Sequence, residues 1–219
     1  MNAFSSDVDL LRYEPTVFKG ATFTGQTLCR GHNGQVSGTV FLASGENFLS
    51  RQIRPGHVIY LSDGAGNIDG VYEIVSVDAS AQLTISALRP DSSAQPVPVG
   101  TAANLLYRIG TFDAQAADAA EILTQMLAIR PGRPDSPYSA ADLVDVGSLR
   151  PLSTLMVLQR IYSGLYQNKE TDGVYLAKRD QYECLARQAA CRCVIQIDAG
   201  ADGIYEKTLA GDIIRLIRV

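Results

Sequence analysis

Four cysteines are the residues of this sequence best suited to metal or redox chemistry: Cys29, Cys184, Cys191 and Cys193. Cys191 and Cys193 are separated by one residue, whereas zinc ribbons and redox pairs place two residues between their cysteines. Both histidines, His32 and His57, are far from these cysteines in the sequence. We therefore expect reduced packing residues rather than ligands, and we predict no metal site and no cofactor.

The segment 198–206 partly resembles a calcium-binding loop, because an aspartate begins it and another recurs within it. An EF-hand loop also needs an oxygen ligand at its third position and a glutamate at its twelfth. Here Gly200 occupies the third position, and Glu206 comes too early. We favour a turn in which Gly200 and Gly203 adopt positive φ.

A second acidic, glycine-rich segment, 63–70, lies between two predicted strands. A phosphate-binding loop requires a following helix and usually a lysine. The residues that follow, 71–75, are typical of a strand instead. We therefore expect this loop to be a hairpin connection.

The two histidines do not form a recognisable catalytic set. A catalytic histidine needs a nucleophile and an acid that orients it. His57 follows Gly56 at the start of a predicted strand, His32 lies in a predicted turn, and the sequence contains no G-x-S-x-G motif. We expect His57 to be a surface or packing residue and the protein not to be an enzyme, with a hydrolase the least favoured class.

Composition and charge narrow the classes of function that this chain can have. The chain has 219 residues, of which 46% are hydrophobic and 19% charged, so it is expected to fold. Its net charge of −4 argues against nucleic-acid binding as the main function. No apolar run approaches the roughly 20 residues that span a bilayer. Residues 1–11 are polar and acidic, so we expect no signal peptide, no membrane partner and folding in the cytoplasm.

Basic residues concentrate in the C-terminal third, as Arg150, Arg160, Arg179, Arg187, Arg192, Arg215 and Arg218. They can belong to solvated helix faces, with i, i+4 pairs such as Glu183 and Arg187. They can equally form ion pairs between subunits, for which arginine is favoured. Spacing alone leaves both interpretations open.

Helical patterns lie at both ends of the chain. A short helix is predicted at 6–14, with Ser5 or Ser6 as its N-cap and Pro15 at its end. Apolar residues at helical spacing predict three more helices, at 113–129, 152–165 and 174–191. Between them, alternating residues and glycine-rich turns predict short strands, at 57–61, 71–77, 82–86 and 105–109.

These patterns predict an α+β protein. We expect a helical bundle with an inserted small antiparallel β-barrel or sandwich and a C-terminal β-hairpin of residues 194–197 and 213–217. Residues 1–20 and 113–219 are assigned to the helical core, and residues 21–112 to the inserted β-module.

The end of the sequence is apolar and basic, whereas chain ends normally fray and are polar. We therefore expect it to dock in its own hairpin or against a partner. The predicted interface residues are Ile213, Ile214, Arg215, Leu216, Ile217 and Arg218.

Two groups of segments resemble the head–tail connector (adaptor) proteins of tailed bacteriophages. The first group comprises 6–18 and 107–112, and the second comprises 155–166, 175–193, 194–198 with Asp202 and Gly203, and 213–218. The resemblance covers most of the chain. It rests on the order of the elements and on these short segments, because this family has no conserved catalytic motif. The inserted β-module is larger than in the simplest members.

The resemblance implies a structural virion protein of the neck, synthesised in the cytoplasm of a bacterial host. It implies a ring of about twelve copies. The portal protein and a tail or tail-completion protein are its implied partners, and such a ring would let DNA pass through its lumen. Two alternatives stay open: another virion component, such as a tail-terminator, tail-completion or decoration protein, and a carbohydrate-binding β-module. Sugar sites usually stack rings on Trp or Tyr, but the sequence has no Trp, and its ten Tyr are spread across both parts.

Overall fold

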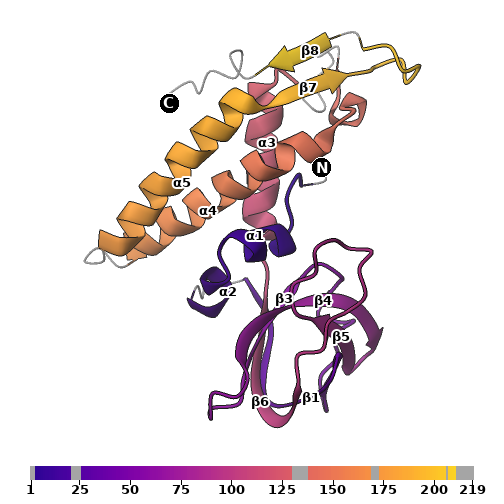
Figure 1. Cartoon of the computed structure of the whole chain (residues 1–219), viewed down its shortest axis with the longest axis vertical. Helices are drawn as coiled ribbons and strands as arrows, with labels where there is room; N and C mark the ends of the chain where they lie inside the picture. The colour runs from indigo at the N-terminus through magenta and orange to yellow at the C-terminus, as the bar shows by residue number, and fades with distance from the viewer. Residues whose placement is uncertain (1–2, 21–25, 130–137, 169–172, 206, 211–219) are drawn as a thin grey trace. The chain divides into compact units, whose positions relative to one another are not determined.

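The computed structural model describes residues 3–20, 26–129, 138–168, 173–205 and 207–210. Contacts divide the chain into two compact units, Ser6–Phe112 on the one hand and Met1–Ser5 with Asp113–Val219 on the other (Figure 1). The fold is of the mixed α+β class, as predicted. Among the described helices, none is long and apolar enough to cross a membrane.

Six strands of the unit Ser6–Phe112 form a closed antiparallel barrel. They are β1 (Thr27–Ser37), β2 (Val40–Ala43), β3 (Val58–Ser62), β4 (Asp69–Ala79), β5 (Gln82–Ser86) and β6 (Thr101–Gly110). Their order around the barrel is β1-β2-β5-β4-β3-β6, and pairing of β6 with β1 closes it. The sequence left a barrel and a sandwich open, and the structure has the barrel. Its interior is filled with side chains that include the fully buried Phe41, Ile59, Ile74, Leu83 and Ile85.

Strand β1 corrects the predicted turn around His32. The run from Gly31 to Gly34 has a turn-like composition, but it lies within β1 and pairs irregularly with β6. The rings of Tyr107 and Phe41 lie where the Cβ atoms of these two glycines would be. Glycine is therefore required here by close packing inside the barrel rather than by a turn.

Helices α1 (Asp7–Tyr13) and α2 (Thr16–Gly20) cluster with the barrel, not with the helical core to which residues 1–20 were assigned. The physical reason is that α1 contacts β3, while α2 contacts both β3 and β4. The predicted N-cap is present, because Ser6 and Asp9 form a capping box at the start of α1.

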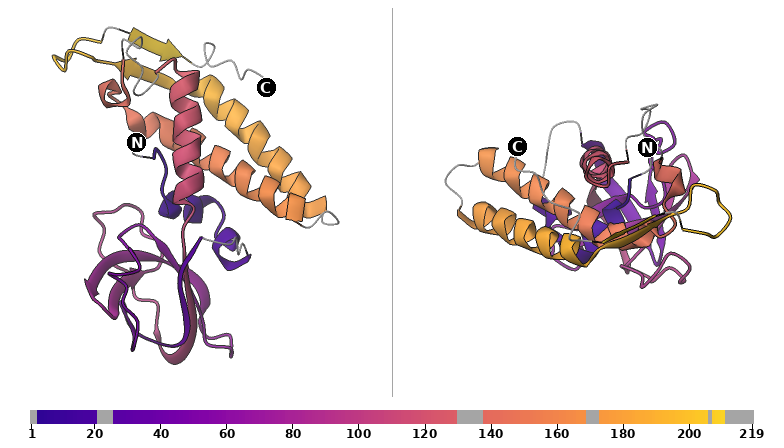
Figure 2. Two further views of the ribbon diagram at one scale, coloured as in Figure 1. Left: turned by 180° about the vertical axis from the view of Figure 1, so that it is seen from behind. Right: turned by 90° about the horizontal axis from the view of Figure 1, so that it is seen from above.

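The other unit contains α3 (Asp113–Met126), the 3₁₀ turns η1 (Ala140–Asp142) and η2 (Val146–Ser148), α4 (Leu149–Asn168) and α5 (Gly173–Arg192). Helix α4 packs against both α3 and α5 (Figure 2). The residues that predicted α4 from their helical spacing are buried, among them Leu152, Leu155, Leu158 and Ile161.

A second, two-stranded sheet follows α5. Strand β7 (Val194–Ile197) pairs antiparallel with β8 (Lys207–Ala210). On the other edge of β7, Leu143 forms a bridge to Ile197, and Val144 donates its N–H to a β7 carbonyl at 3.1 Å. The predicted hairpin paired 194–197 with residues 213–217, but the strand that pairs with β7 is β8. Residues 213–217 lie outside the described residues.

Candidate functional site

A polar cluster in the barrel joins Cys29 of β1, Tyr107 of β6 and Glu46, which follows β2. Side-chain hydrogen bonds link the thiol, the phenol and the carboxylate. Burial, and then the hydrogen bond with Glu46, raises the pKa of the Cys29 thiol to about 11. Burial likewise raises the pKa of Tyr107. Because a nucleophilic cysteine needs a lowered pKa, this cluster fits a packing role.

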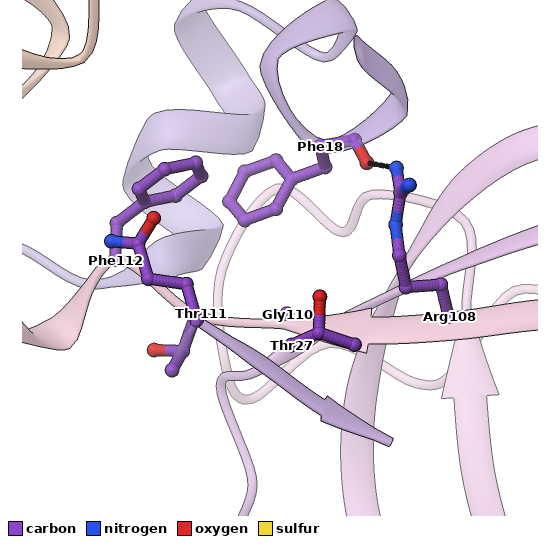
Figure 3. A pocket seen from close by; sticks show the side chains of 7 residues that line it. Phe18, Thr27, Arg108, Gly110, Thr111 and Phe112 are labelled. Carbon is purple, nitrogen blue, oxygen red and sulfur yellow. Dashed lines mark hydrogen bonds between the residues drawn. The ribbon is translucent and has the colours of Figure 1, made fainter. Parts of the chain in front are cut away.

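A small hollow lies beside α2 on the barrel (Figure 3). It is lined by Phe18, Gln26, Thr27, Arg108, Gly110, Thr111 and Phe112. The rings of Phe18 and Phe112 meet edge to face with their centroids 5.2 Å apart, and Arg108 donates to the Phe18 carbonyl at 2.7 Å. The volume of about 20 Å³ suits a single water molecule. We interpret the hollow as a packing gap where α2 is anchored, not as a substrate pocket.

The aspartates of both acidic loops bind backbone amides of their own turns. In the β3–β4 connection, Asp63 accepts from the N–H groups of Ala65 and Gly66 at 2.9 and 2.7 Å. Between β7 and β8, Asp198 accepts from the N–H of Gly203 at 2.9 Å. The β3–β4 loop is a hairpin connection, as predicted. In the β7–β8 loop Gly203 has the predicted positive φ, but Ala201 has it in place of Gly200. The aspartates stabilise both turns.

His57 is buried, with 4% of its surface exposed, and it pairs with groups that the sequence did not link to it. The amide nitrogen of Arg54 lies 3.3 Å from Nδ1 of the ring and its Nε lies 3.2 Å from Nε2, so one of these two N–H groups can donate to the neutral imidazole. A carboxylate oxygen of Asp7 lies within 4.8 Å of a His57 ring nitrogen. Asp7 also accepts the N–H of Phe112 at 2.8 Å. These contacts hold α1 at the start of β3, which fits the packing alternative.

The cysteines are dispersed over both units. Cys29 and Cys193 are buried, Cys184 and Cys191 are exposed on α5, and all four are free thiols. Cys184 and Cys191 are separated by two helical turns, about 10 Å, which exceeds the reach of a disulfide. Burial raises the pKa of Cys193, whose thiol hydrogen-bonds the Ser148 carbonyl. This environment keeps Cys193 protonated.

Three of the C-terminal arginines have acidic partners nearby: Arg187 with Glu183, Arg179 with Asp180 and Arg160 with Asp118. The Glu183–Arg187 pair has the predicted i, i+4 spacing. These local pairs favour solvated helix faces for those three arginines. Arg215 and Arg218 lie outside the described residues.

An exposed apolar face lies on the sheet around β7. Ile195 and Ile197 are fully buried, so Val194 lies on the opposite, outer side of the strand. Leu143 pairs with Ile197, so Val144 lies opposite Gln196, on the same outer side as Val194, and Val146 follows in η2. We call Val144, Val146 and Val194 the valine face; they are 48%, 45% and 51% exposed.

Exposed apolar residues and aspartates lie near the valine face in the sequence. The β7–β8 connection adds Ile204 and Tyr205, which are 68% and 48% exposed. The described residues of 138–148 and 194–210 contain one lysine, Lys207, and four aspartates, Asp142, Asp145, Asp198 and Asp202. An apolar face with a polar rim is typical of an interaction site. Sequence analysis missed it, although the alternation within 194–197 already indicated a strand with two unlike faces.

The predicted interface, Ile213 to Arg218, lies outside the described residues and stays a prediction. Comparisons with known proteins do not identify the chain, because no protein-family model, no curated protein and no solved structure matches it.

Proposed function

We propose that this chain is a structural protein of a tailed-phage neck, where copies form a ring between the portal and the tail. The observation that carries the proposal is the valine face, since three exposed valines on and beside the β7 sheet favour burial against another chain. The barrel interior is filled with its own side chains, which favours a function carried out by the outer surface, such as binding another chain.

In this proposal the helical core is a bundle built on α4, which packs against α3 and α5. Residues 213–218 attach the subunit to the portal or to its neighbour. The barrel forms a collar or lines the ring, and DNA passes through the lumen. Contacts between unlike surfaces of identical subunits support such a ring, because they close when the rotation permits.

The test is particle assembly with a chain cut after Gly211, beside a full-length control chain that carries Val174→Asp at an exposed position. We expect the cut chain to keep its helical circular dichroism but to yield heads without tails. The control should give normal particles. Images of particles that carry a label on this chain should place the label at the neck. Normal, tailed, infectious particles with the cut chain would refute the proposal, and a label on the head surface or at the far tail would favour another virion component.

A further inference from the structure

We propose that the valine face binds residues 213–219 of a second copy of this chain. The inference rests on the proposed function, because it names the subunit contact that would build the ring. It starts from two features that lie close together in the chain: an apolar surface on β7, and an apolar segment that follows β8.

The first argument is chemical complementarity of apolar groups. Residues 213–219 contain five aliphatic side chains, Ile213, Ile214, Leu216, Ile217 and Val219. The valine face offers three exposed aliphatic side chains, and Ile204 and Tyr205 are exposed in the β7–β8 connection. Burying such groups against one another removes apolar surface from water on both sides, which is the main driving force of association.

The second argument is complementarity of charge. The segment carries Arg215 and Arg218 and no acidic residue. The described residues of 138–148 and 194–210 carry four aspartates against one lysine, and Asp145 and Asp202 among them are exposed. Arginine–carboxylate pairs at the rim of an apolar contact set the register of the bound segment.

The third argument is the direction of the contact. The segment follows Ala210, and Ala210 pairs with Val194 of the valine face. The donor segment and the acceptor face consist of different residues of the subunit, so a contact between them is not self-complementary. A contact from the segment of one copy to the face of the next is heterologous, and it repeats until a ring closes.

Two full-length variants separate the two surfaces. The tail variant carries Ile214→Asp and Ile217→Asp, and the face variant carries Val144→Asp and Val194→Asp. Val174→Asp is the matched control, because Val174 is a 61% exposed valine of the same unit, at the start of α5. Circular dichroism of each variant establishes that it is folded.

The first measurement is binding of a fluorescent peptide of residues 211–219 to the tail variant, followed by anisotropy. We expect saturable binding that weakens at high salt. Adding Val144→Asp and Val194→Asp to the tail variant should weaken it roughly tenfold or more, because a carboxylate would be buried in the apolar contact. Adding Val174→Asp instead should leave it unchanged. Absence of binding, or equal binding to all three proteins, would overturn the proposal.

The second measurement is the mass of mixtures in solution by sedimentation. The tail variant retains a face and the face variant retains a segment, so the mixture should form 1:1 pairs that grow no further. Each variant alone should stay monomeric. Peptide binding without pairing of the variants would mean that the segment occupies the face of its own chain, and the second-copy proposal would fail. The neck position is tested separately in particles, so pairing without a neck position refutes only the proposed function.

Discussion

Glu73 of β4 and Arg89, which follows β5, form an ion pair in which each side chain is only 7% exposed. Arg89 also donates to the carbonyls of Ser92 and Ala94, at 3.0 and 2.7 Å. Arg12 of α1 in turn donates to the Arg89 carbonyl at 2.6 Å. The pair therefore joins the barrel wall, the proline-rich stretch after β5 and α1.

Removal of one partner of this pair should destabilise the barrel strongly. We expect Glu73→Ala to lower the free energy of unfolding by about 3 kcal/mol, because a buried guanidinium would lose its counter-charge. The measurement is urea unfolding followed by circular dichroism. Asp69→Ala, which breaks the exposed ion pair with Lys19, is the control and should cost far less. Equal losses in the two variants would show that burial of the Glu73–Arg89 pair does not matter.

A side chain at Gly31 should not fit the barrel. The ring of Tyr107 lies where the Cβ atom would be, so we expect Gly31→Ala to lower the free energy of unfolding by about 2 kcal/mol. Gly20→Ala is the control, since no atom lies within 4 Å of its added Cβ. Thermal unfolding of both variants tests this, and a fully stable Gly31→Ala protein would contradict the close packing.

The buried Cys29 thiol predicts a loss of stability at high pH. Its pKa of about 11 in the folded chain exceeds the ordinary value of 9.0. The folded state therefore retains the proton longer, and stability that is present below pH 9 is lost as the pH rises toward 11. We expect a decrease in the free energy of unfolding on the order of 2 kcal/mol across this range.

Two alanine variants test whether Cys29 causes this loss of stability at high pH. Cys29→Ala should show a smaller decrease between pH 9 and 11 than the unsubstituted chain. Cys184→Ala should keep the full decrease, because Cys184 is exposed. Urea unfolding at a series of pH values measures both. Identical slopes for Cys29→Ala and the unsubstituted chain would assign the effect to other groups.

The buried stripe of α4 should be essential for its unit. Leu158 is fully buried and Ile161 is 1% exposed, so Leu158→Asp or Ile161→Asp places an unpaired carboxylate in the core. We expect either change to cost several kcal/mol and to abolish the cooperative unfolding of the helical unit. Val174→Asp, at an exposed position, should unfold like the unsubstituted chain. Unchanged melting of Leu158→Asp would show that the stripe is not core.

The sequence by itself determined the elements whose signals are local. The capping box of Ser6 and Asp9, the apolar stripe of α4 and the alternation of β5 all involve residues a few positions apart. The same holds for the Glu183–Arg187 pair and the hairpin loop at Asp63. Helical and extended backbones bring such near neighbours together in any fold, so spacing was sufficient to predict them.

Only the tertiary structure decided the features that join distant residues. The ring of Tyr107 occupies the space where Gly31 would have a side chain, and Glu73 of β4 forms an ion pair with Arg89, which follows β5. Val144 lies opposite Gln196 of β7 although fifty-two positions separate them in the sequence. Strand pairing sets these contacts through register and through which strands become neighbours, and neither is encoded in the spacing of nearby residues.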